Sequence, residues 1–273
     1  MFERISDPGL VTTMLCASLI LSACGGGGSS SGSSGTSSSS GGGATTLKAG
    51  LYKAKVTYVN GASSQTATTY LSPTGKLAAV FGGNAGLTLG TLEFDNAKIS
   101  GTSHDYRHLD PEDPSPKGFF ENKGDEEGTI TGTVLSQGAA TFSTADGSGQ
   151  VNTRVTLQRQ NALSDFGISL GRASGTYVMS VTDQPNVSLT VNSDGSLDAQ
   201  YYDCYLGGIE TLSVPDPSIN VFNISYKMSN CSKDIREGDY SGVGFFGPAT
   251  DGRMQMIFAA HNGKVAMKFE GIR

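Results

Sequence analysis

The sequence has no stretch in which apolar residues recur with the 3.6-residue period of an amphipathic helix. Short strand-like runs bounded by glycine and asparagine dominate instead, and glycine provides 38 of the 273 residues. A helix needs the 3.6-residue period to bury one face, whereas strands favour alternation and end at turn residues. The missing helical period therefore predicts an all-β fold.

Basic clusters and tryptophan are also absent. The chain has 19 lysine and arginine residues against 25 aspartate and glutamate residues, giving a net charge of −6, and only 16% of its residues are charged. Proteins that bind nucleic acid, or that adhere to membranes by charge, present basic patches. We therefore expect neither nucleic-acid binding nor charge-driven membrane adhesion.

No apolar run is long enough to span a membrane comfortably. Residues 9–23 are apolar or small and carry no charge, but a transmembrane helix needs about 20 residues. The length of this run and its small residues at the end suit the apolar core of a secretion signal. The run ends in Leu21-Ser22-Ala23, directly before Cys24.

Residues 21–24 resemble the lipobox of bacterial lipoproteins, Leu-[Ala/Ser]-[Gly/Ala]-Cys, at every position. The resemblance implies that residues 1–23 are a lipoprotein signal peptide, and that Cys24 receives a diacylglycerol on its sulfur and an acyl chain such as palmitate on its amine. Gly25 in place of an aspartate implies the outer membrane. Two or three acyl chains anchor a protein stably, because each buried methylene contributes about 0.8 kcal/mol.

The segment after Cys24 cannot form a core. Residues 25–43 consist of nine glycines, nine serines and Thr36. Such a linker is a flexible coil with a mean end-to-end distance of roughly 25 Å and a stretched reach of about 60 Å. We therefore expect residues 24–46 to tether a folded body to the membrane.

The folded part contains an internal repeat. Three short patterns occur twice, in the same order. Residues 50–54 correspond to 175–179, residues 72–79 to 192–199, and residues 128–132 to 238–242. This order predicts two tandem copies of a unit of about 105 residues.

The repeat defines two β domains, residues 47–162 and 163–273. Each has seven or eight short strands, which can close into a small antiparallel barrel or form a sandwich. The design loosely resembles surface lipoproteins with repeated β-barrel lobes, such as transferrin-binding-protein-like lipoproteins. No shared binding motif accompanies this resemblance, so no functional residue is transferred.

The four cysteines have different expected fates. Cys16 leaves with the signal and Cys24 carries lipid. We expect Cys204 and Cys231 to form a disulfide in an oxidising compartment, worth roughly 3–4 kcal/mol; two buried free thiols are the alternative.

Two motif matches do not predict catalysis. Residues 167–171 match the nucleophile elbow G-x-S-x-G, with His261 downstream, and residues 242–247 match the dinucleotide-binding pattern G-x-G-x-x-G. Both motifs require a strand–turn–helix unit that this sequence does not offer. We interpret the first as the boundary between repeats and the second as glycines in a curved strand, and we expect no enzyme and no cofactor.

The histidines predict no metal site. His104 and His108 lie among acidic residues in the segment 102–127, but their spacing fits no defined site, and three prolines favour an extended, solvated loop. We expect His261, beside an Asn-Gly turn, to be exposed.

Recognition is expected on loops. The segment 102–127 and its proposed counterpart, from Cys204 to Cys231, are the longest connections, and loops on a rigid scaffold commonly bind partners. Tyrosines gather near the second segment and are possible ligand-binding residues, although they could equally be core residues. They are Tyr201, Tyr202, Tyr205 and Tyr226.

The sequence thus favours a non-enzymatic, lipid-anchored protein of the outer membrane, surface-exposed or periplasm-facing. It would present two β domains to an extracellular protein or small ligand. The alternatives are a periplasm-facing inhibitor or assembly factor for an envelope enzyme or secretion component, and a structural envelope lipoprotein.

Overall fold

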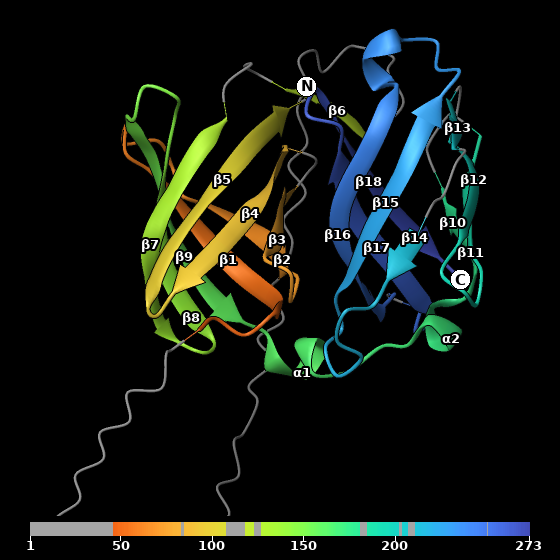
Figure 1. Ribbon diagram of the computed structural model, residues 1–273, viewed down its shortest axis with the longest axis horizontal. Helices are drawn as coiled ribbons and strands as arrows, with labels where there is room; N and C mark the ends of the chain where they lie inside the picture. The colour runs from red at the N-terminus through yellow and green to blue at the C-terminus, as the bar shows by residue number, and fades with distance from the viewer. Residues whose placement is uncertain are drawn as a thin grey trace, which may run out of the picture. The chain divides into compact units, whose positions relative to one another are not determined.

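The computed structural model describes residues 46–82, 85–107, 118–122, 127–180, 185–201, 204–206, 211–249 and 251–273. These residues form two eight-stranded antiparallel sheets, one closed and one nearly closed (Figure 1). The prediction of an all-β fold with two small barrels is confirmed. The signal segment, Cys24 and the Gly/Ser tether lie outside the described residues.

The first barrel is a closed meander. Each strand pairs with the next, and the last strand returns to pair with the first, so the barrel has no exposed edge. Its strands are β1 (Gly50–Tyr58), β2 (Gln65–Leu71), β3 (Lys76–Phe81), β4 (Leu87–Asp95), β5 (Lys98–Arg107), β7 (Gly128–Ser136), β8 (Ala139–Ala145) and β9 (Val151–Arg159).

The second barrel follows the same order and is nearly closed. β13 and β14 both pair with β15 and share one strand position, and β18 meets β10 through the single pair Val178↔Ile272. Its strands are β10 (Gly175–Met179), β11 (Val187–Val191), β12 (Leu197–Tyr201), β13 (Cys204–Leu206), β14 (Thr211–Ser213), β15 (Phe222–Ser229), β16 (Gly238–Pro248), β17 (Met254–His261) and β18 (Val265–Ile272).

Strand β6 (Phe119–Asn122) connects the two sheets. It follows β5 in the chain and pairs with it, and it also pairs with the first three residues of β18. All strands from β1 to β18 therefore belong to one compact unit. The prediction of an extended loop over 102–127 is wrong in part, because β5 continues to Arg107 and β6 lies within the segment.

The repeat is visible in local geometry at the start of three strands. β1, β10 and β16 each open with Gly-x-Tyr, in which the glycine has a positive φ and the buried tyrosine hydroxyl donates to the carbonyl four residues earlier. A positive φ favours glycine because it has no Cβ. The three motifs begin at Gly50 (φ 144°), Gly175 (φ 137°) and Gly238 (φ 123°).

A second correspondence lies in the turns before β3 and β12. Gly75 and Gly195 have φ values of 83° and 88°, and their carbonyls accept hydrogen bonds from the amides of Leu92 and Leu212 at 2.8 and 2.7 Å. A Cβ at either glycine would lie 2.4 Å from the carbonyl oxygen of that leucine. The two halves of the chain therefore repeat the same turn.

The connection between the barrels contains two short helices, α1 (Asn161–Ser164) and α2 (Leu170–Ala173), and a 3-10 turn, η2 (Asp234–Arg236), precedes β16. The expected break near residue 165 coincides with these helices. Among the described residues, no helix has the length and apolar character to cross a bilayer.

Apolar side chains form three clusters. One fills part of the first barrel, a second fills the interior of the second barrel, and a third lies between them. The third joins outward residues of β1–β5, such as Leu89, with Val243 and Phe245 of β16, and the rings of Tyr70 and Phe245 are 4.9 Å apart. The barrels are thus held together by a buried apolar interface.

The predicted disulfide between Cys204 and Cys231 is present, with 4.2 Å between the Cα atoms. The segment that it encloses is not the loop that we expected, because it contains β13, β14 and the whole of β15. The bond therefore fastens neighbouring strands of the second barrel.

Candidate functional site

The predicted ligand-binding tyrosines do not share a face. Tyr205 on β13 is 55% exposed, whereas Tyr226 on β15 is 3% exposed and stacks on Tyr240 inside the second barrel, with 5.1 Å between ring centroids. The alternative reading of a core residue therefore describes Tyr226. The side chains of Tyr201 and Tyr202 lie outside the described part of the chain.

The first barrel contains a cavity of about 490 Å³, within the range of roughly 300–1,000 Å³ that small-molecule sites occupy. The cavity opens at the end of the barrel that carries the β1–β2 and β8–β9 hairpins, as the position of its lining residues along each strand shows. The inward-facing residues that line it include Ala54, Val56, Thr69, Leu77, Ala79, Phe142 and Val155.

Side-chain size explains why the cavity lies at this end. The opposite end is filled by Tyr52, Leu71, Leu92 and Leu157, each no more than 3% exposed. Towards the opening, the inward positions on neighbouring strands become small: Ala54 on β1, Thr69 on β2 and Ala79 on β3. An eight-stranded barrel is just wide enough for side chains to fill or for one small ligand. In the first barrel, the small inward residues leave room for one small ligand.

One buried hydroxyl faces this cavity without a partner. Thr69 is 1% exposed, and its Oγ1 has no hydrogen-bond partner among the described residues. Thr69 pairs directly with Ala79 on β3 and with Tyr52 on β1, so the wall beside it is a single methyl group on the β3 side only. Buried polar groups are almost always hydrogen-bonded to protein or ordered water, so the only partner this hydroxyl can gain is one that enters from the cavity.

Polar side chains at the rim satisfy one another. Thr88 Oγ1 donates to Asp105 Oδ1 at 2.5 Å, and the hydroxyls of Thr144 and Thr153 are 2.7 Å apart. Asp105 and Arg107 add opposite charges at the rim, on exposed positions of β5. Unlike Thr69, these groups keep access to solvent.

A second polar group lies where the barrels meet. His104 on β5 and His261 on β17 have ring centroids 5.5 Å apart, and the Tyr106 hydroxyl lies 2.6 Å from His261 Nδ1. Lys76 Nζ donates to Ser241 Oγ at 2.8 Å across the same interface. A pocket of about 170 Å³ adjoins His104, Lys76 and His261.

The position of His261 corrects a prediction. It is not an exposed turn residue but the last residue of β17, partly buried against the first barrel. Burial, followed by the nearby charges of His104 and Lys76, lowers the pKa of His261 to about 4. The imidazole is therefore neutral at pH 7 and serves as a hydrogen-bonding group of the interface.

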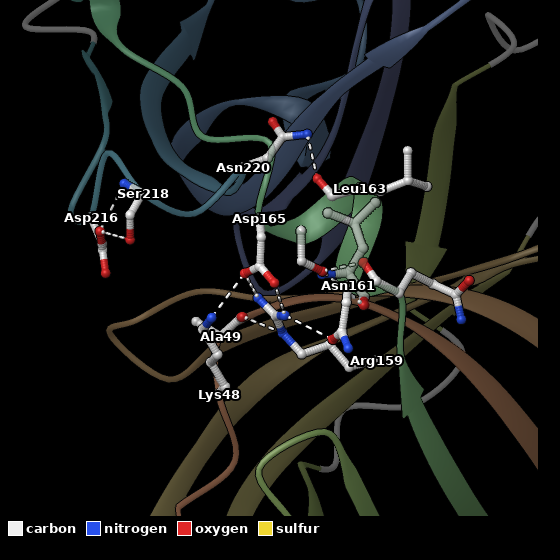
Figure 2. Close-up of polar contacts among 12 residues, drawn as sticks. Lys48, Ala49, Arg159, Asn161, Leu163, Asp165, Asp216, Ser218 and Asn220 are labelled. Carbon is white, nitrogen blue, oxygen red and sulfur yellow. Dashed lines mark hydrogen bonds and ion pairs between the residues drawn. The ribbon is translucent and has the colours of Figure 1, made fainter. Parts of the chain in front are cut away.

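A third polar group fixes the chain as it leaves the first barrel (Figure 2). The buried guanidinium of Arg159 binds both carboxylate oxygens of Asp165, at 2.8 and 3.0 Å, and donates to the Ala49 carbonyl at 2.9 Å. Lys48 Nζ also contacts Asp165 at 2.9 Å. Hydrogen bonds from Arg159 and then Lys48 hold the pKa of Asp165 far below its usual range. The hydrogen-bond partners described for Arg159 and Asp165 all belong to the protein itself, which indicates that this ion pair has a structural role.

The two motif matches lie where we interpreted them. Ser169 of the G-x-S-x-G pattern is the N-cap of α2 and accepts from the Arg172 amide, in the connection between the repeats. Gly242 and Gly244 lie within β16, where an added Cβ would be 2.0 Å from the Ala259 carbonyl oxygen and 2.4 Å from that of Ile257. Close strand contact requires these glycines.

No metal-binding group is formed by the described residues, in which three or more histidine, cysteine, aspartate or glutamate side chains never gather. His108 and most of the acidic residues of the segment 102–127 lie outside the described ranges. The expectation of no metal site therefore remains a prediction.

Sequence reasoning missed the cavity because it looked for recognition on loops. The available signal was one alanine at an inward position of each of two strands, Ala54 on β1 and Ala79 on β3, among larger inward residues such as Val56 and Leu77. Comparison with known protein families, curated protein sequences and solved structures finds no match to this chain. The first-barrel cavity is therefore the best candidate site on geometry alone.

Proposed function

We propose that the chain is a non-enzymatic, lipid-anchored binding protein of the bacterial outer membrane that presents its two barrels to an extracellular protein or small ligand. The observation that carries the proposal is the open cavity at one end of the first barrel. A rigid closed sheet with a partly empty interior is a common design for binding without chemistry.

The sequence supports the location. Residues 21–24 have the lipobox pattern, and the Gly/Ser tether after Cys24 would let the barrels stand away from the bilayer. With two or three acyl chains, the anchor would be stable enough to make membrane residence part of the function.

Labelling of cells tests the anchor. Cells producing the full chain are grown with radiolabelled palmitate, and the protein is compared with its Cys24→Ala variant. We expect label and membrane sedimentation for the wild type and loss of both in the variant. Cys16→Ala is the matched control, because Cys16 precedes the expected cleavage site. An unlabelled wild-type protein would refute the anchor.

Protease treatment of intact and lysed cells tests the orientation. We expect the barrels to be accessible at the surface of intact cells. Added protease should therefore cleave the chain, and an antibody against the second barrel should bind without lysis. Antibody binding only after lysis would contradict presentation to an extracellular partner and would favour the periplasm-facing alternative.

A further inference from the structure

We propose that the first-barrel cavity binds an uncharged, mainly apolar small molecule with one hydrogen-bonding group, and that Thr69 Oγ1 pairs with that group. This inference rests on the proposed binding function and deepens it, because it names the site, the class of ligand and the residue that orients the ligand.

The walls determine the apolar character of the ligand. Ala54, Val56, Leu77, Ala79 and Val155 present only carbon atoms to the cavity. Transfer of apolar surface from water to such walls is favourable in proportion to the area buried. At these walls a ligand rich in hydroxyls or amides would lose its hydrogen bonds with water, because other polar lining residues, such as Gln65, Thr144 and Thr153, lie towards the opening.

The distribution of charge makes the ligand neutral. The charged residues that line the cavity, Asp105 and Arg107, lie at the rim, at the end of β5. An ionised group carried past them to Thr69 would be buried without a counter-ion, which is strongly unfavourable. Acidic lipids or ammonium compounds could therefore enter only with their charged group left at the opening.

Thr69 determines the single polar group. Its hydroxyl is buried and unpartnered in the part of the chain that the structure describes, and Thr69 lines the cavity between its paired neighbours Tyr52 on β1 and Ala79 on β3. A hydroxyl both donates and accepts, so it can pair with an N–H, a hydroxyl or a carbonyl of the ligand. An unpaired buried hydroxyl costs free energy that such a ligand would recover.

Water is the competing occupant. A polar cavity that offers a water two to four partners is normally hydrated, whereas cavities lined by apolar side chains stay dry and accept apolar guests. Thr69 offers one partner beside the carbon walls, and polar lining residues such as Gln65, Thr144 and Thr153 lie towards the opening. The two occupants differ in a measurable way, because only the proposed ligand class would bring an apolar probe into the barrel.

The test is a fluorescence titration with N-phenyl-1-naphthylamine, a neutral aromatic probe with one N–H group. The protein is the full chain with Cys24→Ser, so that no acyl chain competes for the probe. We expect saturable binding of one probe per chain with a blue-shifted emission. A cavity that holds water only would give no saturable binding, and this result would overturn the inference.

Two variants locate the probe. Ala79→Phe fills the cavity beside Thr69 and should abolish saturable binding. Thr69→Val removes the hydroxyl with little change in volume and should weaken binding by roughly 2–10-fold, the effect of one hydrogen bond. The matched controls are Thr131→Phe and Thr131→Val, on the exposed outer face of β7, and should bind as the wild type does. Thermal unfolding confirms that each variant is folded.

The outcomes separate this inference from the proposed function. Binding that is unchanged in both Ala79→Phe and Thr69→Val would overturn the cavity as the site. If Ala79→Phe failed to fold, unchanged binding by Thr69→Val would still overturn the role of Thr69. Palmitate labelling and surface exposure are measured on cells with no probe, so they can succeed or fail independently.

Discussion

The two barrels share one topology but differ in what they enclose. Equivalent positions are related by the repeated turn, so Thr69 and Ala79 of the first barrel correspond to Leu189 and Ala199 of the second, and both pairs face each other across neighbouring strands. On the sixth strand, Ile130 corresponds to Tyr240. The second barrel thus has larger inward side chains where the first has an opening.

The difference is greatest on the later strands of the second barrel. Its inward residues include Phe222, Tyr226, Phe246, Phe258 and Met267, all 3% exposed or less. The same closed sheet can therefore serve as a container or as a packed body, depending on a few inward side chains. We infer that the second barrel mainly supports the first, through the apolar interface and strand β6.

The largest expected contrast concerns a phenylalanine on the seventh strand of each barrel. Phe258→Ala in the second barrel should lower the free energy of unfolding by about 3–5 kcal/mol, as truncation of a fully packed ring does. Phe142→Ala should cost only about 1–2 kcal/mol, because Phe142 already borders the cavity and lacks partners on that side. Guanidinium unfolding measures both, and equal losses would contradict the contrast in packing.

Within the part of the chain that the structure describes, the disulfide lies in the second barrel, and the first barrel has none. Replacing Cys204 and Cys231 together by alanine should cost roughly 3–4 kcal/mol, since the bond closes a loop between residues 27 apart. Relative to the wild type, amide hydrogen exchange in this double variant should accelerate more in β13–β15 than in β1–β3. Equal acceleration in both regions would mean that the barrels unfold as one cooperative unit, and the contrast would then apply to packing but not to stability.

Replacing each of the two corresponding alanines, Ala79 and Ala199, by phenylalanine tests the same contrast by adding volume. Ala199→Phe should destabilise the protein by about 1–3 kcal/mol, because the second barrel has no room for it. Ala79→Phe should leave the free energy of unfolding unchanged or higher, because the ring enters the cavity. Thermal unfolding of the two variants makes the comparison, and a large loss in Ala79→Phe would show that the first barrel is closed to added volume.

The sequence predicted the architecture because its signals were local. Glycines at 50, 75, 175 and 195 specify backbone conformations that other residues avoid, so the repeat could be found without knowing which strands pair. The disulfide was predictable because only Cys204 and Cys231 remain once Cys16 leaves with the expected signal and Cys24 is assigned to lipidation. Each of these inferences needs only neighbouring residues or a count.

The site was not predictable because it depends on pairing. That Thr69 faces Ala79 follows from the register of β2 and β3, and a one-residue slip of either strand would put the two side chains on opposite faces of the sheet. The position of His261 was predicted wrongly for a similar reason. His104 and His261 are 157 positions apart and meet only because β17 packs near β4 and β5. Sequence patterns near each histidine carried no information about the other.

The interface between the barrels should respond to acid. The pKa of His261 is about 4 in the folded protein and about 6.5 when unfolded, so unfolding takes up a proton between these values. The contribution of the neutral imidazole to the free energy of unfolding is therefore complete above pH 6.5 and is lost as the pH falls towards 4. We expect a loss of about 1–2 kcal/mol, reduced by the partial exposure of the ring.

His261→Gln isolates this effect from the titration of other groups. The variant keeps a hydrogen-bonding side chain near Tyr106 but cannot bind a proton in this range. Unfolding free energies at pH 7 and pH 4.5 should therefore differ less in the variant than in the wild type. An identical pH dependence would show that the barrel interface does not sense the imidazole.

The smallest expected effect is the most specific for the cavity. Thr69→Val should raise the free energy of unfolding of the ligand-free protein by about 1 kcal/mol, because it replaces an unpartnered buried hydroxyl by a methyl group. The same change at Thr131 on the outer face should have almost no effect, since that hydroxyl is exposed to water. Chemical denaturation without the probe measures this gain. Paired with the expected loss of probe affinity, a gain in stability would identify Thr69 as a residue whose hydroxyl is kept for a ligand and not for the fold. A loss of stability would instead mean that the hydroxyl has a partner in solution, and the contrast between a container and a packed body would no longer extend to this position.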